Sequence, residues 1–146
     1  MYKNMLVAID GSEHSKKALE FACDLANKHA AYLTMLHVAY DTAQTHTMVL
    51  GTSAMSYQGD QKELDEMAQV VMDAARGIAD VAGCTDTKFE VKQGIPSEQI
   101  LKYSSDNNID LVILGSRGLS DVAGFFQDSV SHKVNHLSEC TCITVR

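Results

Sequence analysis

Several features are scarce in this sequence, and each scarcity excludes a class of protein. Tryptophan is absent, and proline occurs once in 146 residues. No uncharged apolar run reaches the roughly 18 residues that a membrane-spanning helix requires. The cysteines never form the C-x-x-C spacing of zinc or thioredoxin-like sites, so we expect reduced, mostly buried thiols and no tightly bound structural metal. They are Cys23, Cys84, Cys140 and Cys142.

Positive charge is also in short supply. Lysine and arginine total 12 against 19 aspartates and glutamates, which gives a net charge of −7. Because nucleic acids and anionic membranes are bound through clustered Lys and Arg, this balance argues against both as partners. A single nucleotide is compatible with it, since backbone amides at a helix start hold phosphates without many basic side chains.

Length and composition fit a single domain over residues 1–146. Hydrophobic residues make up 45% and charged residues 21%, which is ordinary for a soluble globular protein. Residues 1–5 lead directly into an apolar run and carry no cleavage-site or transit-peptide pattern. We therefore expect a cytoplasmic location.

Hydrophobic periodicity alternates between short apolar runs and helical patterns. It predicts strands at 4–9, 31–39, 86–92, 109–114 and 141–146, and helices at 13–29, 64–82, 96–107 and 128–136. Strictly alternating strands and helices imply an α/β fold: an open parallel sheet of five strands, doubly wound, with helices on both faces in a three-layer sandwich. The strand at 86–92 is expected near an edge. The polar segment 41–60 is predicted to be a lid or a disordered loop.

The glycines after the fourth predicted strand mark the candidate site. Ligands of such sheets bind beyond the carboxyl ends of the strands, where the strand order reverses. Gly115 and Gly118 allow a close backbone approach, and Ser129 and Ser131 lie where the last helix begins, so its free N–H groups and hydroxyls suit phosphate oxygens. Taken alone, this spacing is more typical of a tight strand-to-helix turn, because it is neither a dinucleotide motif nor a P-loop.

Two other patterns are interpreted as structural. His132 and His136 have metal-ligand spacing on a helix, but Lys133 replaces the glutamate of a metalloprotease motif, which favours surface or packed histidines. Ser12 precedes a helix and is interpreted as its N-cap, since the neighbouring His14 cannot form a catalytic triad with it on one helix start. No catalytic residue and no protein-held metal is assigned.

Five segments, in this order, resemble the universal stress protein family: NMLVAIDGSEHSKKAL, GIPSEQI, DLVILGSRG, SVSHKV and TCITVR. The resemblance extends over residues 3–146. It implies the adenine nucleotide alpha hydrolase-like, flavodoxin-like sheet. It also implies binding of ATP or AMP, a homodimer, and a stress-linked regulatory role with slow or no nucleotide hydrolysis.

The family's nucleotide pattern is G, two residues, G, nine residues, then G followed by S or T. Gly115, Gly118 and Ser129 match it, whereas Asp128 replaces the third glycine. The resemblance places Asp10 by the adenosine, the backbone of Val38 at the adenine edge, and Ala8 beside the base. The other residues expected at the nucleotide are Ser116, Arg117, Val130 and Ser131.

Asp128 places a negative charge where the phosphates would lie. At about 5 Å and an effective dielectric of 20, one such charge pair costs roughly 3 kcal/mol before screening, or about two decades of affinity. Two outcomes stay open. Either Mg²⁺ bridges Asp128 and a phosphate, or the site refuses ATP and holds AMP, adenosine or nothing. Arg117 offsets part of the repulsion if it points inward.

We therefore predict a regulatory protein with weakened ATP affinity. The bound nucleotide is expected to alter the shape or ordering of segments 41–60 and 115–128, and this change is expected to alter the contacts of the protein with a protein partner that the sequence does not name. Met48 and Met55 either cover the adenine or lie in a disordered loop. The alternatives are a nucleotide-independent dimeric interaction module, which Asp128 favours, and a slow nucleotide hydrolase.

The last predicted strand exposes an edge, and an unprotected edge invites pairing with a second copy. The expected dimer interface is Thr141, Cys142, Ile143, Thr144 and Val145.

Overall fold

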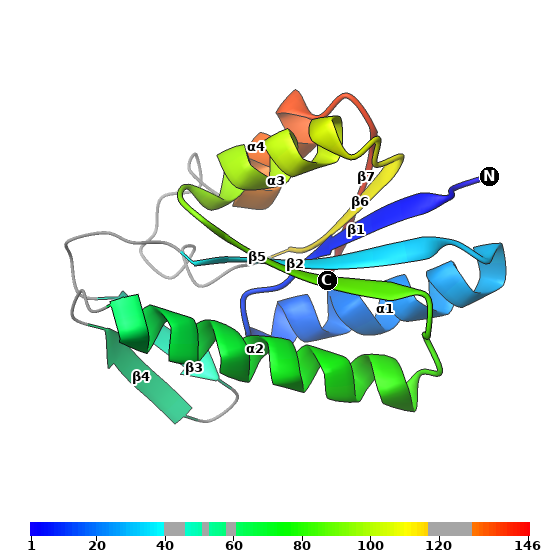
Figure 1. Ribbon diagram of the computed structural model, residues 1–146. Helices are drawn as coiled ribbons and strands as arrows, with labels where there is room; N and C mark the ends of the chain where they lie inside the picture. Colours follow the sequence, from blue (N-terminus) through cyan, green and yellow to red (C-terminus); the bar gives the residue numbers. More distant parts are fainter. Residues whose placement is uncertain (40–45, 51–52, 58–60, 117–129) are drawn as a thin grey trace.

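The computed structural model describes residues 1–39, 46–50, 53–57, 61–116 and 130–146 (Figure 1). A parallel sheet of five strands has the order β5-β2-β1-β6-β7. Its strands are β1 Asn4–Ala8, β2 Tyr32–Ala39, β5 Thr87–Gln93, β6 Leu111–Gly115 and β7 Thr141–Val145. The described helices are α1 Glu13–His29, α2 Gln61–Val81, α3 Pro96–Asp106 and α4 Val130–Leu137. The predicted α/β fold is confirmed, and β5 does lie at an edge.

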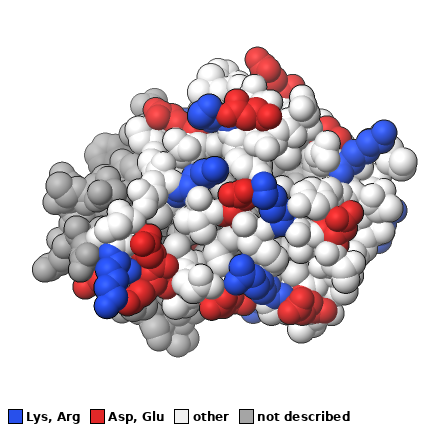
Figure 2. Space-filling view, viewed as in Figure 1, with Lys and Arg blue, Asp and Glu red and all other residues white. Residues whose placement is uncertain are grey.

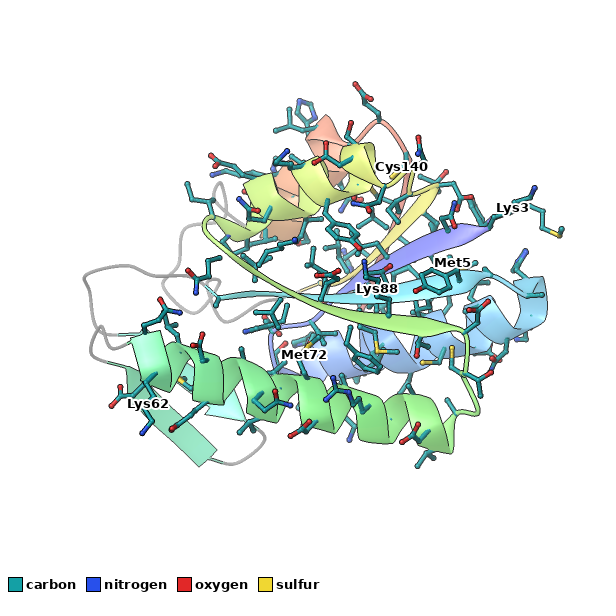
Figure 3. All side chains as sticks on the ribbon, in the orientation of Figure 1. Lys3, Met5, Lys62, Met72, Lys88 and Cys140 are labelled. Atoms are coloured by element: carbon teal, nitrogen blue, oxygen red, sulfur yellow. The ribbon has the colours of Figure 1, made fainter. Side chains whose placement is uncertain are left out.

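The two largest apolar clusters of the described residues hold the layers together. One lies between the sheet and helices α1 and α2, and includes Met5 and Met72, both labelled in Figure 3. The other lies between the opposite face and helices α3 and α4, and includes Leu6, Ile100 and Val134. Adjacent residues Met5 and Leu6 belong to different clusters because side chains alternate across a strand, which is why β1, buried on both faces, is a continuous apolar run.

Local sequence signals set the helix ends. The Ser12 side chain accepts a hydrogen bond from the N–H of Ser15 at 3.2 Å, so it is the predicted N-cap of α1. Pro96 occupies the first turn of α3, where its missing N–H costs no hydrogen bond. Gly83 follows α2 with a φ of 65°, the left-handed conformation that favours glycine at a helix end.

The segment predicted as a lid or disordered loop contains an antiparallel hairpin. Strands β3 His46–Leu50 and β4 Ser53–Tyr57 form a separate two-stranded sheet, with Met48 opposite Met55. The sequence carries a weak signal for it, because two β-prone runs are separated by only Gly51 and Thr52. Whether these methionines cover a ligand lies outside the described side chains.

Charge is dispersed on the face seen in Figure 2, where acidic and basic side chains alternate over the described residues and form no basic stripe. Most described ion pairs join neighbours along one helix, as Lys28 and Asp24 do at 2.6 Å. Such exposed pairs contribute little to stability. No helix in the described part of the chain is both long and apolar enough to cross a membrane.

Candidate functional site

The strand order reverses direction between β1 and β6. From the central strand β1 the chain builds β2 and then β5 on one side, and later β6 and β7 on the other. Connections that leave adjacent strands in opposite directions open a crevice at the sheet edge, where ligands of such folds bind. Asp10 follows β1, and Gly115 and Ser116 end β6, so these predicted site residues come together at this point.

The turn between β1 and α1 is held by its own hydrogen bonds. The Ser12 N–H donates to Oδ1 of Asp10 at 2.9 Å, and Ser15 Oγ donates to the Ser12 carbonyl at 2.9 Å. The Asp10 N–H in turn donates to Ser15 Oγ at 3.3 Å. Gly11 has a φ of 82°, which a residue with a side chain adopts only at a cost. The Asp10 carboxylate is therefore held in one place at the carboxyl end of β1.

A buried histidine ties the neighbouring strand to this turn. His37 of β2 is 3% exposed, and its Nδ1 lies 2.9 Å from the carbonyl oxygen of Ile9. Burial lowers the pKa of His37, partly opposed by that hydrogen bond and by the charge of Asp10, so the neutral ring is favoured. The following residue, Val38, packs with Ala8 against the apolar cluster on the α3–α4 face. The two residues expected beside the adenine thus share one face of the sheet.

Gly115 makes a close contact with α1 that explains its lack of a side chain. A Cβ at this position would lie 2.7 Å from the carbonyl carbon and 2.8 Å from the carbonyl oxygen of His14. The sequence analysis expects glycine here because a ligand would come close to the backbone. The structure gives a second reason for glycine: the start of helix α1 packs directly against the end of strand β6. Beside it, His14 Nδ1 is buried and has no hydrogen-bond partner in the described structure.

Replacing Gly115 with alanine is expected to lower the free energy of unfolding by about 1–3 kcal/mol, because backbone atoms must move to admit the methyl group. Urea denaturation followed by circular dichroism measures this loss. Gly77→Ala is the matched control. No atom lies within 4 Å of its added Cβ on α2, so it should stabilise the protein by about 1 kcal/mol. Equal midpoints for Gly115→Ala and the unmodified chain would contradict the close packing.

The remaining predicted residues divide between described and undescribed parts. Ser116 N–H donates to the Val145 carbonyl at 2.7 Å, which joins the start of the site loop to the edge strand β7. Helix α4 begins at Val130, with Ser131 in its first turn. Four predicted residues lie outside the described structure: Arg117, Gly118, Asp128 and Ser129. The electrostatic role of Asp128 therefore stays a prediction.

The other reactive side chains form no further site in the described residues. No group of three or more potential metal ligands occurs there. His132 and His136 are exposed on α4 with ring centroids 6.3 Å apart. All four cysteines are free: Cys23 and Cys84 are buried, and Cys140 and Cys142 are half-buried. Burial raises the pKa of the Cys23 thiol to about 12, which makes it a poor nucleophile.

The sequence did not predict two contacts at this site. One is the hydrogen bond between His37 and the Ile9 carbonyl, and the other is the close packing of His14 against Gly115. From the sequence, His14 is expected only at the start of a helix, and His37 only within the strand at 31–39. A histidine in a strand that is otherwise apolar was the available signal for His37, because a buried polar side chain requires a partner.

A family model, curated relatives and solved structures all match this chain to the same family. The model of the universal stress protein family matches residues 1–146. The chain is 32% identical over 148 aligned positions to the universal stress protein YxiE of Bacillus subtilis, and all of both chains is covered. The structure resembles the universal stress protein UspA from Lactobacillus plantarum, with a TM-score of 0.79, 30% identity, and coverage of 99% and 98% of the two chains. It also resembles a universal stress protein solved in complex with cAMP, with a TM-score of 0.77, 22% identity, and coverage of 99% and 97%.

Proposed function

Because this chain belongs to the universal stress protein family, we propose that it binds an adenosine monophosphate at the crevice between β1 and β6. Solved proteins of the same fold hold related ligands. One is the complex with cAMP, one from Archaeoglobus fulgidus contains dAMP, and one from Arabidopsis thaliana contains AMP. They share 15–22% identity with this chain, so they support the proposal through the fold.

The observation that carries the proposal is the preformed turn of Asp10 at the strand-order reversal. Its carboxylate is held by Ser12 before binding, so a ribose hydroxyl would meet an acceptor that is already ordered. The orphaned Nδ1 of His14, beside Gly115, is a second polar atom at this end of the sheet that a ligand's polar group would satisfy. Both fit a small polar ligand such as a nucleotide.

The number of phosphates is set by Asp128. Each added phosphate charge is repelled by the carboxylate, so AMP is preferred over ATP unless Mg²⁺ bridges the two groups.

The protein acts as a regulator of a stress response in the cytoplasm. Nucleotide binding changes the segments at the crevice and, through them, the contacts with a protein partner.

The same protein forms a homodimer through β7. The two edges of the sheet differ in their protection. On β5, Glu90 makes ion pairs with Lys88 at 2.6 Å and Lys92 at 3.9 Å (Lys88 is labelled in Figure 3), and charged side chains on an edge discourage pairing. The sequence of β7, Thr141–Val145, has no charged residue. The free side of β7 is therefore the edge that a second copy pairs with.

The experiment that tests nucleotide binding begins with the purified protein. It is denatured, and any released nucleotide is identified by chromatography. Calorimetric titrations with AMP and ATP follow, each with and without Mg²⁺. We expect AMP to bind in the micromolar range and ATP, without Mg²⁺, about 100-fold more weakly. Absence of binding of both at millimolar concentrations would defeat the proposal.

A nucleotide-independent dimeric module is the second candidate, and Asp128 is the feature that favours it. It predicts an intact dimer that binds neither AMP nor ATP. A slow nucleotide hydrolase ranks below both, because Asp128 is the one residue that the sequence offers as a base to activate water. A phosphate-release assay at high protein concentration separates it from the other two.

A further inference from the structure

The hydrogen bond of His37 lies where the pairing of two site-forming strands ends. The register of β1 and β2 runs from Asn4 opposite Tyr32 to Ala8 opposite Leu36. Beyond it, the Ile9 N–H donates to the Leu36 carbonyl at 2.9 Å, and the His37 ring reaches back to the Ile9 carbonyl at 2.9 Å. The ring thus extends the link between the two strands by one further hydrogen bond at their carboxyl ends.

The direction of this bond is fixed by its partner. A carbonyl oxygen only accepts, so Nδ1 of His37 must carry the hydrogen, and in the neutral ring Nε2 carries none. A buried imidazole without such a partner would be costly, and a buried carbonyl left unpaired would be costly as well. Both groups therefore favour the arrangement in which β2 is held against the residue that follows β1.

The two bonded residues flank the expected adenosine contacts. Ile9 lies between Ala8 and Asp10, and His37 directly precedes Val38. A shift of Ile9 relative to His37 would change the distance between the Asp10 carboxylate and the Val38 backbone. A ligand that contacts both at once requires that distance to be fixed, because small misplacements cost much of the binding free energy.

We propose that His37 is a positioning residue of the nucleotide site: its Nδ1–H bond to the Ile9 carbonyl sets the separation of the ribose-binding turn and the base-binding backbone. His37 touches no nucleotide atom itself. This inference rests on the proposed function. The hydrogen bond between His37 and the Ile9 carbonyl, called the strap below, is nevertheless present in the protein without ligand and can be tested in that state.

Two substitutions distinguish positioning from simple filling of the core. In His37→Asn the side-chain amide nitrogen takes the place of Nδ1 and donates to Ile9. In His37→Gln the amide lies farther out, at the place of Nε2, and misses that carbonyl. Both variants stay polar and both lose the imidazole. We expect AMP affinity within about threefold of the unmodified protein for Asn, and a loss of about tenfold for Gln, which corresponds to about 1.4 kcal/mol.

Ser104→Ala is the control for general destabilisation. Ser104 on α3 is also buried, and its Oγ donates to a carbonyl, that of Ile100, at 2.7 Å, away from the crevice. This variant should lose stability in urea yet bind AMP with unchanged affinity. If His37→Gln binds AMP as tightly as the unmodified chain, or if His37→Asn fails as severely as His37→Gln, the proposal is wrong.

Hydrogen exchange gives a readout without nucleotide. The Ile9 amide should exchange about tenfold faster in His37→Gln and within about threefold of the unmodified rate in His37→Asn, while amides of β6 stay unchanged in both. If the unmodified protein binds no AMP, the proposed function fails, and the exchange rates still decide whether the strap exists. Equal exchange of the Ile9 amide in all three proteins would overturn it.

Discussion

Asp128→Gly is expected to tighten ATP binding about 100-fold in the absence of Mg²⁺. The substitution removes one negative charge from the expected phosphate position, and a charge pair at about 5 Å costs roughly 3 kcal/mol at an effective dielectric of 20. It also restores the family's pattern of three glycines before Ser129. AMP should gain less than ATP, because it brings fewer negative charges near the carboxylate. Calorimetric titration of both nucleotides measures the difference.

Two further variants separate the causes of this effect. Asp128→Asn removes the charge but keeps the size of the side chain, so it should reproduce most of the gain if repulsion is the cause. Asp24→Asn changes net charge equally at an exposed residue of α1, paired there with Lys28, and should leave both affinities unchanged. If Asp128 instead holds Mg²⁺, then Asp128→Asn will weaken binding of ATP with Mg²⁺. Unchanged ATP affinity in Asp128→Gly would show that the electrostatic argument is wrong.

Thr144→Pro is expected to convert the proposed homodimer into a monomer. The Val145 carbonyl faces β6, since it accepts from Ser116, and successive residues of a strand point their N–H and C=O groups to opposite sides. Cys142 and Thr144 therefore present theirs to the free edge. Proline removes one outward donor in each copy, at about 1.4 kcal/mol apiece, so two-fold symmetry weakens association about 100-fold.

The matched control is Thr144→Val, which keeps the backbone N–H but loses the hydrogen bond that Thr144 Oγ1 accepts from Asn135 at 2.8 Å. It should remain a dimer. Sedimentation velocity across micromolar concentrations measures both variants, and circular dichroism checks that each remains folded. A Thr144→Pro protein that is folded and still dimeric would place the interface elsewhere, with the charged edge β5 the next to examine.

The order of the five strands of the main sheet and the four helices between them was predictable, because each of these elements carries its own periodicity, whereas the hairpin of β3 and β4 was not predicted. The helix expected at 13–29 is α1, at the same bounds, since an apolar stripe and the capping residue Ser12 are both local signals. The strand expected at 31–39 begins one residue before β2, and the strand expected at 86–92 is displaced by one residue at both ends from β5. The long helix begins three residues earlier than its apolar stripe, because its first turn is polar.

The contacts that build the site were less predictable, because they join residues far apart in the chain. The sequence predicts a close backbone approach at Gly115, but no local pattern shows that the His14 backbone lies against it. Asp110 accepts hydrogen bonds from the N–H groups of Lys3 and Asn4, at 2.8 and 3.2 Å, and so fixes the start of β1. Sequence alone places Asp110 inside the strand expected at 109–114, whereas β6 begins only at Leu111. Contacts of this kind depend on which strands are neighbours in the sheet. The alternation of strands and helices along the sequence does not determine that order.

The bond between Ser116 N–H and the Val145 carbonyl has a thermodynamic consequence. It joins the backbone that leads into the proposed nucleotide site to the strand that we propose pairs with a second copy, so we expect nucleotide binding and self-association to be energetically linked. Linkage is reciprocal: whatever factor nucleotide applies to self-association, self-association applies to nucleotide affinity. For the proposed dimer, the nucleotide affinity that is measured should therefore depend on protein concentration, and dilution alone should change the occupancy of the site.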